Sequence, residues 1–77
     1  MSQSASPEGA ARKILAIVTE ETAAGEIMMV GAVNLKFLTA GGTAEDCAAG
    51  MEYAVEQGWL EAAGVAVRLT DLGAGLE

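Results

Sequence analysis

The sequence predicts a single α+β domain in which three helices precede a two-stranded hairpin. Two patterns indicate these elements. Apolar residues recur at steps of three and four over residues 7–22 and 43–57, which is the spacing of one helical face. At residues 65–70, after a Gly-containing turn, large apolar residues instead alternate with Ala66, Arg68 and Thr70, which is typical of a half-buried hairpin strand. A chain of 77 residues suits one domain, which buries only about 60% of its unfolded surface.

The first helix is expected at about residues 7–22. Ser6 is suited to cap the first free amides, and Pro7 and Glu8 are both favoured in a first helical turn. The apolar stripe of this helix consists of Ala11, Ile14, Leu15, Ile17 and Val18. Residues 1–5 are rich in Ser, Gln and Ala, so we expect a disordered N-terminus before a domain that spans residues 6–73.

Residues 26–40 are apolar on nearly all sides, so periodicity does not distinguish a helix from a buried strand. Their length favours a helix, whereas their β-branched content favours a strand. We predict a helix that ends before Gly41 and Gly42. Met28 and Met29 then either fill the core or line an interface or ligand groove.

The third helix, at about residues 43–57, has the clearest boundaries. Thr43 and Asp46 have the spacing of a capping box, in which the Thr43 side chain accepts a hydrogen bond from a first-turn backbone amide and the Asp46 side chain reaches back toward Thr43. Gly58 suits the left-handed position that ends a helix, and Trp59 can pack back on the last turn. The apolar stripe consists of Ala44, Cys47, Ala48, Met51, Ala54 and Val55.

The hairpin is expected to pair strands at about residues 59–62 and 65–70. Asp71, Leu72 and Gly73 should then turn the chain away from the hairpin into a tail at residues 74–77. The final pair, Leu76 and Glu77, resembles a remnant of a cloning site.

Charge and composition restrict the partners. Eleven acidic and four basic residues give a net charge of −7, and nucleic-acid binding requires clustered cations, so a nucleic-acid partner is disfavoured. The hydrophobic fraction of 52% is high for a short chain and leaves apolar surface for a protein partner or for a second copy in a homodimer. The N-terminus lacks a signal peptide and no apolar run could span a bilayer, so we expect a cytoplasmic protein with no membrane partner.

The residue types present disfavour catalysis. The chain has no His, and its one Cys, Cys47, excludes an internal disulfide and a thiolate metal site. Cys47 falls in the apolar stripe of the third helix, where we expect a buried and unreactive thiol. We therefore predict a protein that is not an enzyme and that uses no metal or cofactor.

Two short motifs flank the predicted hairpin: Gly58-Trp59-Leu60 before it and Leu69-Thr70-Asp71-Leu72-Gly73 after it. Together with the order of elements, these motifs resemble the winged helix-turn-helix domain of small bacterial transcriptional regulators. The resemblance implies a winged-helix fold and, as in many such regulators, DNA binding through the third helix with the wing on the DNA backbone or minor groove. The contacts then implied are the four basic residues, Arg12, Lys13, Lys36 and Arg68.

The third helix, however, lacks the chemistry of a DNA-reading helix, because it holds four acids and no Lys or Arg. The face opposite its apolar stripe carries Glu45, Ala49, Glu52, Tyr53 and Glu56. The simpler interpretation of this face is a solvated surface that benefits from the helix dipole. The functional interpretation is a docking face for a basic protein, with Tyr53 as its anchor. A DNA-binding regulator is the alternative, and a small-ligand site near Met28 and Met29 is a third hypothesis.

Overall fold

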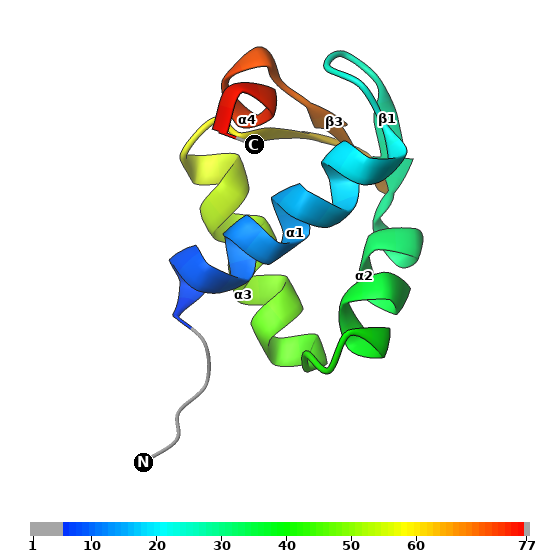
Figure 1. The fold of residues 1–77 in the computed structure, drawn as a ribbon, viewed down its shortest axis with the longest axis vertical. Coiled ribbons are helices and arrows are strands. Elements are labelled where there is room, and N and C mark those ends of the chain that lie inside the picture. Colours follow the sequence, from blue (N-terminus) through cyan, green and yellow to red (C-terminus); the bar gives the residue numbers. More distant parts are fainter. Residues whose placement is uncertain (1–5, 77) are drawn as a thin grey trace.

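The computed structural model describes residues 6–76, over which the chain forms four helices and a three-stranded antiparallel sheet. The elements are, in order, α1 (Pro7–Glu21), β1 (Ile27–Met29), α2 (Val30–Thr39), α3 (Ala44–Glu56), β2 (Leu60–Ala63), β3 (Ala66–Leu69) and α4 (Asp71–Leu76). Figure 1 shows α1 lying across α3, with the sheet and α4 at the end of the molecule opposite the loop between α2 and α3. The predicted α+β class is confirmed. The expectations for residues 1–5 and for Glu77 lie outside the described residues.

Helices α1 and α3 begin where their capping residues predicted. The Ser6 Oγ accepts a hydrogen bond from the Gly9 amide at 3.1 Å, and the Thr43 Oγ1 accepts one from the Asp46 amide at 3.1 Å. Gly58 follows the last turn of α3 with a φ of +79°, which is the left-handed conformation that a non-glycine residue rarely adopts. The Thr43 side chain and the Gly58 backbone conformation therefore set the two ends of α3 locally.

The helix predicted for residues 26–40 is wrong in its first part, because Ile27–Met29 form strand β1 and α2 begins at Val30. Strand β1 pairs antiparallel with β3, and Met28 lies opposite Val67. This pairing satisfies main-chain groups that a helix would otherwise bond internally, and it buries the Met28 side chain in the core. Tertiary pairing thus outweighs the tendency of a long apolar segment to form one helix.

The predicted two-stranded hairpin therefore supplies two strands of a three-stranded sheet. Its order is β1-β3-β2, so β3 lies in the centre. The hairpin itself is confirmed, with β2 and β3 paired in a register that places Glu61 opposite Arg68 and Ala63 opposite Ala66. The positive φ of Gly64, +67°, allows the tight connection between the two strands.

A fourth helix, α4, replaces the turn that was expected at residues 71–73. The Thr70 hydroxyl organises this junction, since it lies 2.6 Å from the Gly58 carbonyl oxygen and 2.9 Å from that of Trp59, and it accepts from the Gly73 amide at 3.0 Å. The motif after the hairpin therefore fastens the start of α4 to the end of α3.

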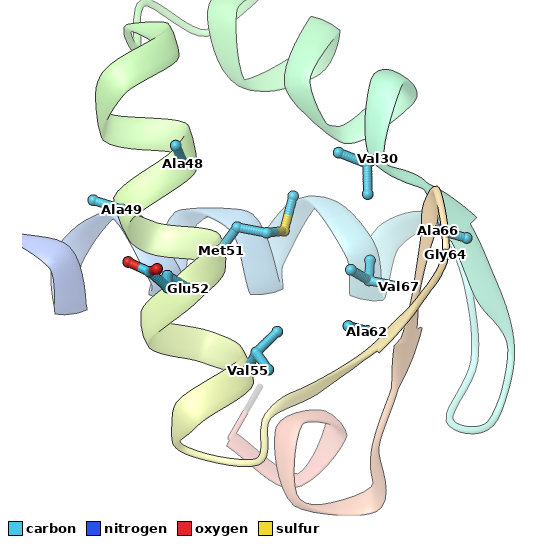
Figure 2. A pocket seen from close by; sticks show the side chains of 10 residues that line it. All are labelled: Val30, Ala48, Ala49, Met51, Glu52, Val55, Ala62, Gly64, Ala66 and Val67. Carbon is cyan, nitrogen blue, oxygen red and sulfur yellow. The ribbon is translucent and has the colours of Figure 1, made fainter.

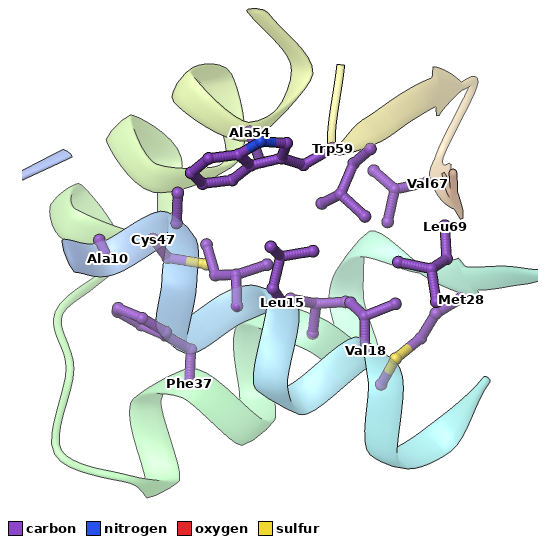
Figure 3. Close-up of a cluster of buried hydrophobic side chains, with 14 residues drawn as sticks. Ala10, Leu15, Val18, Met28, Phe37, Cys47, Ala54, Trp59, Val67 and Leu69 are labelled. Atoms are coloured by element: carbon purple, nitrogen blue, oxygen red, sulfur yellow. The ribbon is translucent and has the colours of Figure 1, made fainter. Parts of the chain in front are cut away.

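The core lies between α1, α2, α3 and the inner face of the sheet (Figure 3). Ile14, Leu15 and Val18 of α1 are fully buried at its centre, and Trp59 closes it beside the hairpin. Helices α1 and α3 approach closely at Gly50, where an added Cβ would lie 2.8 Å from the backbone carbonyl carbon of Ala10.

This close approach also corrects the apolar stripe predicted for α3. The buried residues of α3 are Cys47, Gly50 and Ala54, whereas Ala48 is exposed and Met51 is half-buried. The stripe is rotated because glycine has no side chain to separate the helices, so α1 packs against the Gly50 side of α3. Part of the predicted stripe consequently remains on the surface.

Candidate functional site

The outer face of α3 forms an acidic surface, which consists of the exposed side chains of Glu45, Glu52 and Glu56. The helix contains no Lys or Arg, and the ion pairs found among residues 6–76 all involve acids of other elements. We refer to these three residues as the acidic face. Its negative charge is therefore not compensated by ion pairs within the described chain.

The two uncharged residues predicted for this face lie toward its edge. Ala49 and Tyr53 are both half-buried. The Tyr53 ring packs edge-on against Trp59, with ring centroids 5.5 Å apart, so Tyr53 belongs partly to the core. The sequence pattern therefore identified the acids of the surface correctly, but it placed Tyr53 more centrally on that surface than the structure does.

The four basic residues lie on three different elements, and three of them are held by nearby acids. Arg12 pairs with Glu8 at 3.2 Å on α1, where its guanidinium also lies 5.3 Å from the centre of the Trp59 ring. Lys36 of α2 pairs with Glu21 at 3.3 Å.

The remaining two basic residues, Arg68 and Lys13, form no ion pair with the acidic face. Arg68 of β3 pairs with Glu61 on the neighbouring strand at 3.2 Å. Lys13 of α1 borders a small pocket with Phe37 and Gly42, near the end of α2. The structure thus brings the acids together on one helix and leaves the cations dispersed.

An apolar groove of about 550 Å³ lies beside the acidic face, between α3, the start of α2 and the β2–β3 hairpin. We call it the α3–hairpin groove. Figure 2 shows Met51 and Val55 pointing from α3 toward the hairpin, while the Glu52 carboxylate lies on the outer side of α3. The groove is lined by Val30, Ala48, Ala49, Met51, Glu52, Val55, Ala62, Gly64, Ala66 and Val67.

The groove exists because small residues occupy positions that larger side chains would fill. Ala62, Gly64 and Ala66 line the hairpin side of the groove, across from the α3 residues that the rotated packing leaves outside the core. Sequence reasoning missed this groove. The available signal was the width of the apolar stripe on α3, which exceeds what contact with α1 alone can cover.

Cys47, Met28 and Met29, which the sequence singled out, lie outside the groove. Cys47 is buried as predicted, and burial raises the pKa of its thiol because desolvation disfavours the thiolate. Met28 is buried in the core, whereas Met29 is 52% exposed on the opposite face of β1. The two methionines therefore do not line a common pocket.

Among residues 6–76, no three or more Cys, Asp or Glu side chains gather closely enough to hold a metal ion. None of the helices described has the length and apolar character needed to cross a bilayer. Comparisons with protein-family models, with curated proteins and with solved structures give no match for this chain. The candidate site is therefore defined by its own geometry and charge.

Proposed function

We propose that the chain is a small winged-helix module that binds another protein, and that the acidic face of α3 docks a basic surface of this partner. The order α1-β1-α2-α3-β2-β3 is compatible with a winged helix. The single observation that supports the docking function is the concentration of charge: α3 has four acids, no cation, and no ion pair with the rest of the described chain.

Uncompensated like charges on one helix repel each other, and cations of a partner relieve this repulsion on binding. Each exposed ion pair contributes only about 0.2–1 kcal/mol, so the acidic face by itself provides orientation and a faster encounter more than tight affinity. A partner that supplies several Lys or Arg residues would form an ion pair with each acid, and each pair would add to the binding free energy. The proposed complex should consequently weaken as the salt concentration rises.

A DNA-binding regulator is less well supported by the same geometry. DNA-reading helices present Arg, Lys, Asn or Gln to bases and phosphates, whereas α3 presents Glu45, Glu52 and Glu56. Arg12, Lys36 and Arg68 pair with acids on or beside their own elements.

The test uses a display library of random peptides selected on the wild-type protein. We expect the selected peptides to be enriched in Lys and Arg. Reversal of one charge, in Glu52→Lys or Glu56→Lys, should weaken their binding by about fivefold. The variant loses one ion pair and gains one repulsion between like charges, and the two changes together cost about 1 kcal/mol of binding free energy. The matched control is Glu20→Lys, which makes the same charge change at an exposed acid of α1 and should leave the affinity unchanged.

Selection of peptides without basic residues, or equal weakening by all three reversals, would contradict the proposal. Random duplex DNA provides the second arm, in a mobility-shift assay at low salt. Phosphate binding is strongest under these conditions, so a shift there would favour the regulator instead.

A further inference from the structure

We propose that the α3–hairpin groove is a socket for one bulky apolar side chain of the same partner. The partner segment would then carry an aliphatic or aromatic residue flanked by Lys or Arg. This inference rests on the proposed function, because the acidic face beside the groove is what favours the flanking cations. It extends that function by naming the chemistry of the segment that binds.

The lining of the groove fits an apolar side chain. Glu52 is the only charged residue among those that border it, and its carboxylate lies on the outer side of α3 rather than over the floor. Met51, Val55 and Val67 supply the larger apolar surfaces. Water in such a groove has few polar groups to bond, so its displacement by a hydrocarbon side chain is favourable.

The position of the groove links it to the acidic face. Glu52 belongs both to the acidic face and to the border of the groove, so a segment whose apolar residue enters the groove has its neighbouring residues beside this carboxylate. Lys and Arg at those neighbouring positions would place their cations near Glu52 and Glu56. Charge complementarity therefore selects a basic segment over an acidic or neutral one.

A second copy of this chain is a poor source for such a segment. Ile14 follows Lys13, and Phe37 follows Lys36, but both apolar side chains are buried in the core. Leu35 is 65% exposed beside Lys36, but Lys36 is paired with Glu21. Two chains that each carry a net charge of −7 also repel each other.

The experiment compares two synthetic peptides whose sequences differ at a single residue. Both have Lys-Ser repeats on each side of a central position, which is Leu in the first peptide and Ala in the second. Binding of each peptide to the full chain is followed by amide chemical shifts. We expect the wild-type protein to bind the Leu peptide about tenfold more tightly, since burial of the additional carbon atoms is worth at least that factor.

The variant Ala48→Leu tests whether the groove produces this preference. Ala48 is an exposed groove residue of α3, and a leucine there should occupy the socket and lower the tenfold ratio to nearly one. The matched control is Ala32→Leu, an equal change at an exposed position of α2 outside the groove, which should keep the ratio. Ala62→Leu on the hairpin provides a second blocking variant if Ala48→Leu fails to fold.

The charge variant separates the two proposals. Glu52→Lys should weaken both peptides by the same factor and preserve their ratio. If it does so while the wild-type ratio is near one, the socket is refuted and the docking function stands. If it weakens neither peptide, the docking function fails. Persistence of the tenfold ratio in both blocking variants would also overturn the socket, as would a dimer in sedimentation that both Leu35→Ala and Ala48→Leu dissociate.

Discussion

Replacement of Gly50 by Ala tests the central packing contact of the molecule. Gly50 lies in the middle of α3 and faces α1. A Cβ at this position would lie 2.8 Å from both the carbonyl carbon and the Cβ of Ala10, and 2.9 Å from the Ala11 amide nitrogen. These atoms belong to the backbone or are fixed to it, so no side-chain rotation can relieve the clash. Helix α1 itself would have to move.

The expected magnitude follows from two opposing effects. Alanine is favoured over glycine inside a helix by about 1 kcal/mol, which would stabilise the variant. An additional methyl group in a close-packed interface costs about 1–3 kcal/mol, and displacement of α1 would also loosen the contacts of buried Ile14 and Leu15. We expect Gly50→Ala to lower the free energy of unfolding by about 1–2 kcal/mol, which corresponds to a decrease in Tm of roughly 5–15 °C for a domain of this size.

The assay is thermal unfolding followed by circular dichroism, with Gly31→Ala as the matched control. Gly31 lies in α2, and nothing within 4 Å would contact an added Cβ there. Gly31→Ala makes the same chemical change without the clash, so its Tm should equal or exceed that of the wild type. An increase in Tm for Gly50→Ala would refute the close approach of α1 and α3.

Two further predictions concern α3. Thr43→Ala removes the bond from the Asp46 amide to the Thr43 hydroxyl, so the midpoint of urea unfolding should fall by an amount equivalent to about 1 kcal/mol, and Thr43→Ser should restore it. Because burial raises the pKa of Cys47 above its ordinary value of 9.0, the thiol is neutral in both states below that pH, and above it the unfolded state loses the proton first. Stability should therefore fall more steeply above pH 9.0 in the wild type than in Cys47→Ala, and identical slopes would show that the thiol is not desolvated.

The elements that the sequence predicted well are those set by neighbouring residues. Ser6 and Thr43 cap their helices through amides three residues away, and Gly58 ends α3 through its own backbone conformation. The hairpin is likewise local, since Gly64 lies within the connection between its two strands. These features require no knowledge of the rest of the chain.

Strand β1 and helix α4 depend instead on residues that are distant in sequence. The Val30 amide donates to the Val65 carbonyl, and this partner is not evident from the apolar segment itself. Helix α4 begins beside Thr70, whose hydroxyl contacts the carbonyls of Gly58 and Trp59 only after the hairpin has folded back. Periodicity reports local burial, so neither long-range contact could be read from it.

The acidic face of the candidate site could be predicted from local spacing, whereas the groove could not. Acids one or two helical turns apart share a face whatever the rest of the chain does, so Glu45, Glu52 and Glu56 could be placed together from their spacings of seven and four residues. The groove could not be predicted from spacing, because its position depends on which side of α3 contacts α1. Gly50 determines this side, because its lack of a side chain permits the close approach of α1 to α3.

The packing at Gly50 therefore connects the stability of the fold to the proposed function. Contact with α1 on that side of α3 leaves Ala48, Met51 and Val55 toward the hairpin, where small residues leave the groove open. If α1 moved to accommodate a larger residue at position 50, α3 would be free to turn its apolar residues inward, and the groove would narrow. A variant such as Gly50→Ala should then lose the preference for the Leu peptide even where it remains folded, whereas Gly31→Ala should keep it.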